Sequence, residues 1–281
     1  MELRWIVILL TLVGCGSSTT APPSVLQQIT SEVARIRPVL DKEVFEASGD
    51  SLLFAGLLCG SGEAWACDVV HRSQAGDGTF YRSPTHLDRE SEDMSRDQGL
   101  GPLLAVGGPV PMYNLVGWVR FLNENDGYLS RNRDDKAKTT ASYRKLIEEV
   151  TRQHVDGSLP DPLHGVNGIG VTSWFNEDYE LHLNSLVLFL NDRIGNDTLG
   201  MRSSRKALVD REPDNCWFQY LNDDANRAAN CLLTHLQKFD TPVVVEPGFL
   251  DWMWQRPAAQ WYSKTYPNGW EFVMLANFLG G

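Results

Sequence analysis

The chain has 281 residues, of which 42% are hydrophobic and 22% charged, and its formal net charge at pH 7 is −11. No run of Lys and Arg is available to neutralise phosphates, which argues against nucleic acid as a partner. The length suits one large domain or two small ones. Because no second linker-like stretch follows the first 24 residues, we expect a single domain over residues 25–281.

The first residues resemble a bacterial lipoprotein signal. Arg4 precedes an apolar run over residues 5–10, and Leu12-Val13-Gly14-Cys15 resembles the lipobox, in which the Cys becomes the lipidated first residue. We therefore expect a signal peptide over residues 1–14, a lipid on Cys15 and a flexible tether over residues 15–24. A plain secretory signal is the alternative. By resemblance to lipoprotein sorting rules, Gly16 favours the outer membrane.

Apolar residues at helical spacing predict helices along most of the chain. The first, over residues 25–44, should be divided at Pro38. Further helices are expected over residues 51–58, 64–74, 112–122, 139–155, 177–194, 201–211, 217–221, 226–239 and 270–279. The main strand signals lie at residues 79–81 and 243–246, so the sequence predicts a mainly α fold, with exposed and more apolar helices in paired layers.

One more helix start is predicted in the middle of a polar stretch. Ser95 stands three residues before Gln98, which is the spacing of a capping box, so a helix should begin at Ser95. Asp97 would then lie in the first turn, where the helix N-terminus keeps a carboxylate ionised and able to accept a proton. A purely stabilising role for this Asp is the alternative. Gly99 and Gly101 indicate close packing against a neighbouring backbone.

The helix predicted over residues 177–194 is apolar almost all round in its second half, so it should be buried. Its polar start contains Tyr179 and His182 at helical spacing, and the two could face one space. A hydrogen-bonded core histidine is the alternative. Trp174 lies beside the Gly-rich residues 164–170 and is a candidate for a cleft rim that stacks on sugar rings. That Gly-rich run lacks the Lys of a phosphate-binding loop.

Four cysteines remain besides Cys15, an even number for an oxidising compartment, so we expect disulfides. Proximity in sequence favours Cys59 with Cys67 and Cys216 with Cys231, while other pairings and free thiols stay open. No cysteine pair has zinc-like spacing with neighbouring His residues, so a Cys-based metal site is not expected. We therefore expect no metal and no cofactor.

The chain resembles the (α/α) toroid glycan-degrading enzymes, such as unsaturated glucuronyl hydrolases, in three features. These are the loop DGTFYRSP, the SRDQ that opens a predicted inner helix and the nine Trp residues. The chain is also similar to an uncharacterised group of bacterial and phage proteins, and this similarity implies no activity. It is carried by the stretches SRDQGLGPLLAV, YELHL, NCWFQYL and WEFVMLANFLGG. The first resemblance implies an (α/α) toroid-like fold or an incomplete helical barrel of paired helices.

The toroid resemblance also implies roles for individual residues. In such glycosidases, carboxylates at inner-helix ends act as general acid and base. Asp97 would be the base or stabiliser, with Asp93 or Glu177 as the acid. Residues suited to hold hydroxyls or a uronate carboxylate are Tyr81, Arg82, Arg96 and Gln98. In a polysaccharide lyase, Tyr179 and His182 would instead transfer the proton.

These observations predict a glycan-active hydrolase of the bacterial envelope that touches the membrane only through its lipid anchor. A polysaccharide lyase is one alternative. The other is a non-catalytic surface lipoprotein that binds a glycan or a protein partner. The sequence does not identify the sugar, the bond or the second carboxylate.

Overall fold

The computed structural model describes residues 24–46, 51–86, 94–109, 114–133, 138–154, 178–196, 198–240, 254 and 268–280, with only the backbone for residues 44, 45 and 178–180. This part of the chain contains twelve α-helices and two short 3-10 helices. Its β-structure consists of two isolated bridges, Gln74 with Phe80 and Tyr128 with Lys138. The prediction of a mainly helical protein is confirmed.

The observed helices follow the predicted order. They are α1 (Val25–Ile36), η1 (Arg37–Val39), α2 (Lys42–Glu46), α3 (Ser51–Ser61), α4 (Ala64–Arg72), η2 (Pro84–His86), α5 (Leu100–Leu104), α6 (Leu115–Glu124), α7 (Ala141–His154), α8 (Asp178–Arg193), α9 (Leu199–Arg211), α10 (Cys216–Leu221), α11 (Ala225–Lys238) and α12 (Trp270–Phe278). The predicted division at Pro38 is confirmed, because this residue lies in η1 between α1 and α2. No described helix combines the length and the apolar composition needed to cross a lipid bilayer.

The predicted start of α5 at Ser95 is wrong, because the helix begins at Leu100. Residues 96–99 form turns, in which Leu100 N–H donates to the carbonyl of Asp97 at 3.0 Å and Gly101 N–H to that of Gln98 at 2.9 Å. These bonds span three residues, which is tighter than an α-helical turn. Gln98 also directs its side-chain oxygen to α3 rather than to Ser95. We call residues 95–99 the α5 turn.

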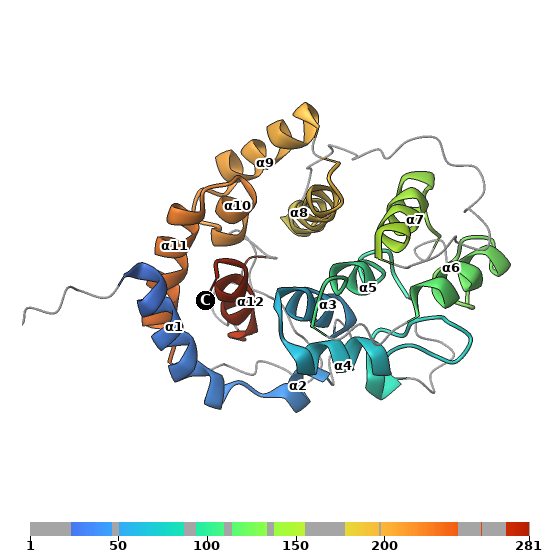
Figure 1. The fold of residues 1–281 in the computed structure, drawn as a ribbon, viewed down its shortest axis with the longest axis horizontal. Helices are drawn as coiled ribbons and strands as arrows, with labels where there is room; N and C mark the ends of the chain where they lie inside the picture. Colours follow the sequence, from blue (N-terminus) through green and yellow to red (C-terminus); the bar gives the residue numbers. More distant parts are fainter. Residues whose placement is uncertain are drawn as a thin grey trace, which may run out of the picture.

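The helices form an inner and an outer layer. Figure 1 shows α3, α5, α8 and α12 in the middle of the molecule, with α1, α4, α6, α7, α9 and α11 around them. Every residue of α3 except the last is buried, and so are the first seven of α12, whereas α1, α6 and α11 each bury one face. This alternation matches the predicted pairing of apolar helices with more exposed ones.

The inner helices have their C-terminal ends together. Arg193, the last residue of α8, donates to the carbonyls of Leu104 and Val106 at the end of α5 and to that of Gly60 near the end of α3. Its guanidinium also lies 5.9 Å from the ring centroid of Phe278, the last residue of α12. The inner helices therefore run in one direction, and their N-terminal ends lie on the opposite side.

Both predicted disulfides are present. Cys59 pairs with Cys67 across a Cα–Cα distance of 4.7 Å and ties α3 to α4. Cys216 pairs with Cys231 across 5.5 Å and ties α10 to α11. Each bridge joins helices that are neighbours in sequence, which is what the short spacings predicted.

The inner helices α3 and α5 cross with their backbones in direct contact. A Cβ atom added to Gly56 would lie 2.1 Å from the carbonyl oxygen of Gly101, and one added to Gly101 would lie 2.3 Å from the carbonyl oxygen of Leu52. Real Cβ atoms do not approach backbone oxygens this closely, so only glycine fits at either position. The predicted close packing at Gly101 is confirmed.

We expect Gly101→Ala to lower the free energy of unfolding by about 1–3 kcal/mol or more, because α3 and α5 must separate to admit the methyl group. Urea denaturation followed by circular dichroism measures the change. The control is Gly200→Ala on the exposed face of α9, where the nearest atom to the new Cβ is 3.8 Å away. That change should raise stability by up to about 1 kcal/mol. Equal effects of the two substitutions would contradict the packing argument.

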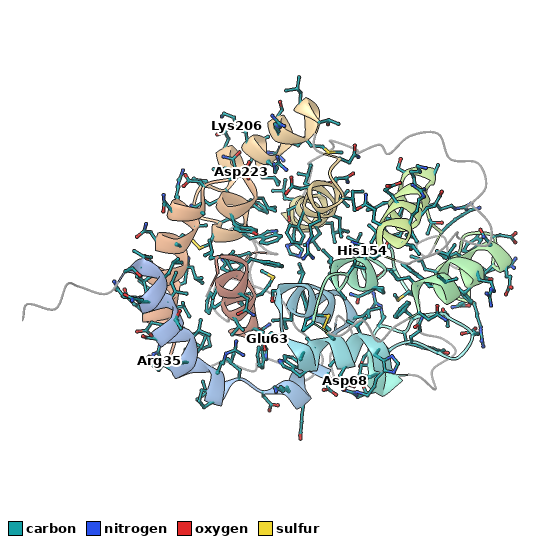
Figure 2. All side chains as sticks on the ribbon, viewed as in Figure 1. Arg35, Glu63, Asp68, His154, Lys206 and Asp223 are labelled. Atoms are coloured by element: carbon teal, nitrogen blue, oxygen red, sulfur yellow. A yellow bond between two sulfur atoms is a disulfide. The ribbon has the colours of Figure 1, made fainter. Side chains whose placement is uncertain are left out.

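An ion pair between η1 and the start of α4 is also hydrogen-bonded to α12. Glu63 lies at the start of α4 (Figure 2). Its carboxylate receives hydrogen bonds from Arg37 at 2.6 and 3.0 Å and from Asn277 at 2.9 Å, and its side chain is only 10% exposed. Burial by itself would raise the pKa of Glu63. The hydrogen bonds from Arg37 and Asn277 and the charge of Arg37 outweigh burial, so the pKa is lowered. The ionised carboxylate therefore stabilises the fold.

Because the folded-state pKa of Glu63 lies below its unfolded value of 4.5, its contribution should be complete above that pH and lost as the pH falls through the folded-state pKa. Glu63→Gln should lower the free energy of unfolding at pH 7 by about 1–3 kcal/mol. It should also flatten the dependence of stability on pH below about 4.5. Asp210→Asn, in an exposed pair with Lys206 on α9, is the control and should change stability by less than about 1 kcal/mol. If the stability of Glu63→Gln depended on acidic pH in the same way as that of the parent chain, this assignment would be refuted.

Candidate functional site

The predicted functional residues that the structure describes gather mainly at the α5 turn. This turn precedes an inner helix that packs on α3, α7 and α8. Within it, Arg96 is exposed and Asp97 is half-buried. The turn thus places a carboxylate and a guanidinium side by side in sequence at the N-terminal end of the inner layer.

A buried tyrosine lies beneath the turn. Tyr143 on α7 is 9% exposed, and a Cβ on Gly99 would lie 2.6 Å from its hydroxyl oxygen, so the hydroxyl packs against the backbone of the turn. It has no hydrogen-bond partner among the described residues. Burial raises the pKa of Tyr143 well above its usual value, the charge of Asp97 raises it further, and that of Arg96 lowers it. The hydroxyl therefore stays protonated, and its pKa depends on both neighbouring charges.

Two other predicted residues fix the turn to α3 instead of facing solvent. Gln98 is fully buried, and its Oε1 accepts a hydrogen bond from the N–H of Leu53 at 3.3 Å. The carbonyl of Arg82 accepts from the N–H of Leu52 at 2.8 Å, and Arg82 Nη2 donates to Ser95 Oγ at 3.0 Å. These bonds satisfy free amides in the first turn of α3. They hold the α5 turn and the loop around Arg82 in one unit.

The remaining predicted residues lie elsewhere or outside the described part. Tyr81 is half-buried, and its N–H donates to the carbonyl of Ser73 at 2.8 Å. His182 on α8 is 2% exposed, which fits the alternative of a core histidine. Tyr179 lies in the first turn of α8, where only the backbone is described. Residues outside the described ranges are Asp93, Glu177, Trp174 and Cys15.

The described aromatic residues mostly fill the core. Trp118 and Trp270 are 0% and 3% exposed and therefore belong to the core. Trp118 packs edge-on against Phe80, with ring centroids 5.5 Å apart. A shelf of exposed Trp rings, as a sugar-binding surface would need, is not found among the described residues.

Comparison of the chain with protein-family models, with curated proteins and with solved structures gives no match. The mainly helical architecture is compatible with an (α/α) toroid. The argument for function therefore depends on the geometry around Asp97, Arg96 and Tyr143.

We expect substitutions of Gln98 and of Arg96 to have very different effects on the free energy of unfolding. Gln98→Ala should lower the free energy of unfolding by about 1–3 kcal/mol, because it leaves the buried N–H of Leu53 without its acceptor. Arg96→Ala, two residues earlier and exposed, should change it by less than about 0.5 kcal/mol. Chemical denaturation of the two variants makes the comparison. Similar losses would mean that Gln98 does not hold the turn to α3.

Proposed function

We propose that this protein is a glycan-active hydrolase anchored in the bacterial envelope, with an (α/α) toroid-like fold and Asp97 as its proton-accepting carboxylate. The observation that supports the proposal is the half-exposed residue Asp97 in the turn that precedes inner helix α5, beside exposed Arg96 and close to the buried hydroxyl of Tyr143. The anchor at Cys15 is part of the proposal on the basis of the lipobox alone.

The direction of the inner helices favours this side of the molecule as the substrate side. Their C-terminal carbonyls meet at Arg193, so their N-terminal ends, which carry partial positive charge, lie opposite. That field attracts an anionic sugar. A toroid of paired helices places catalytic carboxylates at inner-helix ends in the same way.

Each residue of the cluster has a chemical part in the proposed reaction. Asp97 accepts the proton of the attacking water or stabilises the oxocarbenium-like transition state. Arg96 binds the carboxylate of a uronic acid through paired N–H donors. The protonated hydroxyl of Tyr143, which has no partner among the described residues, would donate a hydrogen bond to the Asp97 carboxylate once substrate is bound. The general acid that protonates the leaving group is Asp93 or Glu177.

The test measures reducing-end release and the absorbance of unsaturated uronates across a panel of bacterial polysaccharides, with a chain beginning at Ser24. Ser24 is kept because it caps α1 and forms a capping box with Gln27. Asp97→Asn should reduce turnover about 100-fold or more, as expected for loss of a general base. Asp210→Asn on α9 is the matched control and should retain full activity.

Tyr143→Phe separates function from folding. It removes a buried hydroxyl that has no partner among the described residues, so stability should stay the same or rise by about 1 kcal/mol while turnover falls. Full activity in both variants would place the active site elsewhere. Unsaturated products would identify a lyase, and retention of a glycan without cleavage would identify a binding protein.

A further inference from the structure

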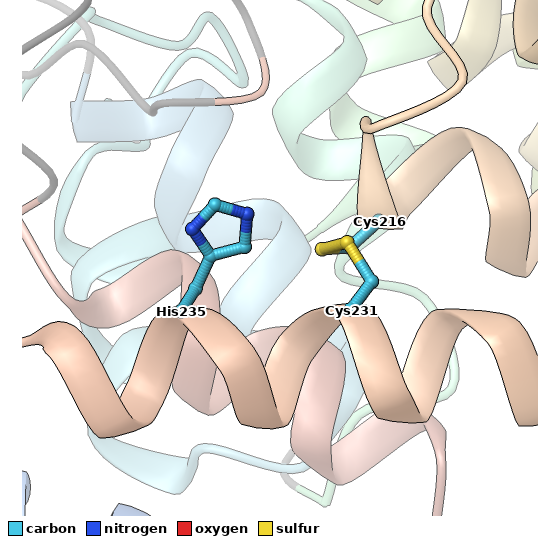
Figure 3. Close-up of side chains that lie close together, drawn as sticks. All are labelled: Cys216, Cys231 and His235. Carbon is cyan, nitrogen blue, oxygen red and sulfur yellow. A yellow bond between two sulfur atoms is a disulfide. The ribbon is translucent and has the colours of Figure 1, made fainter.

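A histidine lies beside the disulfide that joins α10 to α11. Cys216 is the first residue of α10, and Cys231 and His235 stand four residues apart on one side of α11 (Figure 3). A ring nitrogen of His235 and both sulfur atoms lie within 4.8 Å of one another. Two thiolates and an imidazole are a donor set that Zn²⁺ prefers.

A reductant can reach this bridge from one side. Cys216 is fully buried, but Cys231 is partly exposed, and its Sγ lies 3.5 Å from the carbonyl oxygen of Asp214 at the surface. The other bridge differs, because Cys59 and Cys67 are both fully buried. Thiol exchange requires access to a sulfur atom, so the bridge at Cys231 should be reduced first.

The two helices are held together by more than the bridge. Arg227 of α11 donates to the carbonyl of Pro213 at 3.2 Å, and the N–H of Asp224 donates to the carbonyl of Gln219 in α10 at 3.2 Å. The ring of His235 lies nearly parallel to that of Phe272 on α12, at a centroid distance of 6.2 Å. We therefore expect α10, α11 and the imidazole to stay in place when the disulfide is broken.

We propose that reduction converts this bridge into a binding site for a thiophilic divalent cation such as Zn²⁺, with Cys216, Cys231 and His235 as ligands. A dithiol reductant supplies two electrons and two protons and becomes a disulfide, and the two protein thiols then release their protons to the solvent as the metal binds. Zn–S and Zn–N bonds of about 2.3 and 2.1 Å place tetrahedral ligand atoms roughly 3.5–3.8 Å apart. Once the S–S bond is broken, side-chain rotation moves the two sulfur atoms apart to this distance, and the imidazole nitrogen, at most 4.8 Å from them, moves closer.

The ligand number also indicates what the ion could do. Three protein ligands leave a fourth position of a tetrahedral site open to water, which is typical of catalytic rather than structural zinc. The site is formed by α10 and α11, apart from the α5 turn, so it does not depend on the proposed glycan chemistry.

The experiment titrates the full chain with Zn²⁺ against a competing chelator, before and after treatment with a dithiol that is then removed without air. The reduced protein should bind one Zn²⁺, and Co²⁺ in its place should give the charge-transfer absorption of thiolate ligation. The oxidised protein should bind at least about 100-fold more weakly, because its sulfur atoms are not thiolates.

Variants identify the ligands. Loss of an outer-shell partner of a metal weakens binding about 10- to 100-fold. His235→Ala removes a direct ligand, so it should weaken Zn²⁺ binding by more than this. Cys216→Ser with Cys231→Ser should abolish binding in either redox state. The matched controls are His71→Ala, on the exposed surface of α4, and Cys59→Ser with Cys67→Ser, and both should bind Zn²⁺ like the reduced parent chain.

Four results would overturn the proposal. The first is equal Zn²⁺ affinity of the oxidised and reduced chains, and the second is unchanged affinity in His235→Ala. The third is loss of helical circular dichroism on reduction, because the ligands would then no longer be held together. Absence of Zn²⁺ binding by the folded, reduced chain counts in the same way.

Discussion

Arg193 lies where the C-terminal ends of the parallel inner helices meet. Helices that run in one direction bring their negative C-terminal ends together, which is unfavourable without a compensating charge. Arg193 supplies that charge, because its guanidinium donates to carbonyls of α3 and α5 and lies over the rings of Phe189 and Phe278. This arrangement lets α3, α5, α8 and α12 share one polarity, so that their N-terminal ends lie on the same side of the layer.

The proposed site follows from that polarity together with a close helix crossing. Gly56 and Gly101 bring the backbones of α3 and α5 into contact, and Gln98 then reaches the first turn of α3. The α5 turn is fixed from below by these contacts while Asp97 stays half-exposed. A rigid backbone under a partly exposed carboxylate is the arrangement that precise positioning of a reacting group requires. The Cys216 bridge lies in a different pair of helices and adds a separate, redox-dependent chemistry.

The sequence did not predict that some residues belong to the two sites. Tyr143 belongs to the sparse apolar face of an amphipathic helix, and nothing in its spacing indicates that its hydroxyl meets the α5 turn. The Cys231 and His235 pair is different, because four residues on a helix place two side chains on one face. That spacing was available in the sequence, but the third ligand, Cys216, is brought to it only by the disulfide.

By itself, the sequence determined the helical class and the division of the first helix at Pro38, and it favoured the two disulfide pairings that the structure has. These features depend on residues close in the chain, where periodicity, proline and short cysteine spacings act directly. Only the tertiary structure decided that α5 begins at Leu100, that Gln98 caps α3 and that Tyr143 lies under Asp97. These outcomes depend on contacts between residues 40 or more positions apart, whose distances no local pattern encodes.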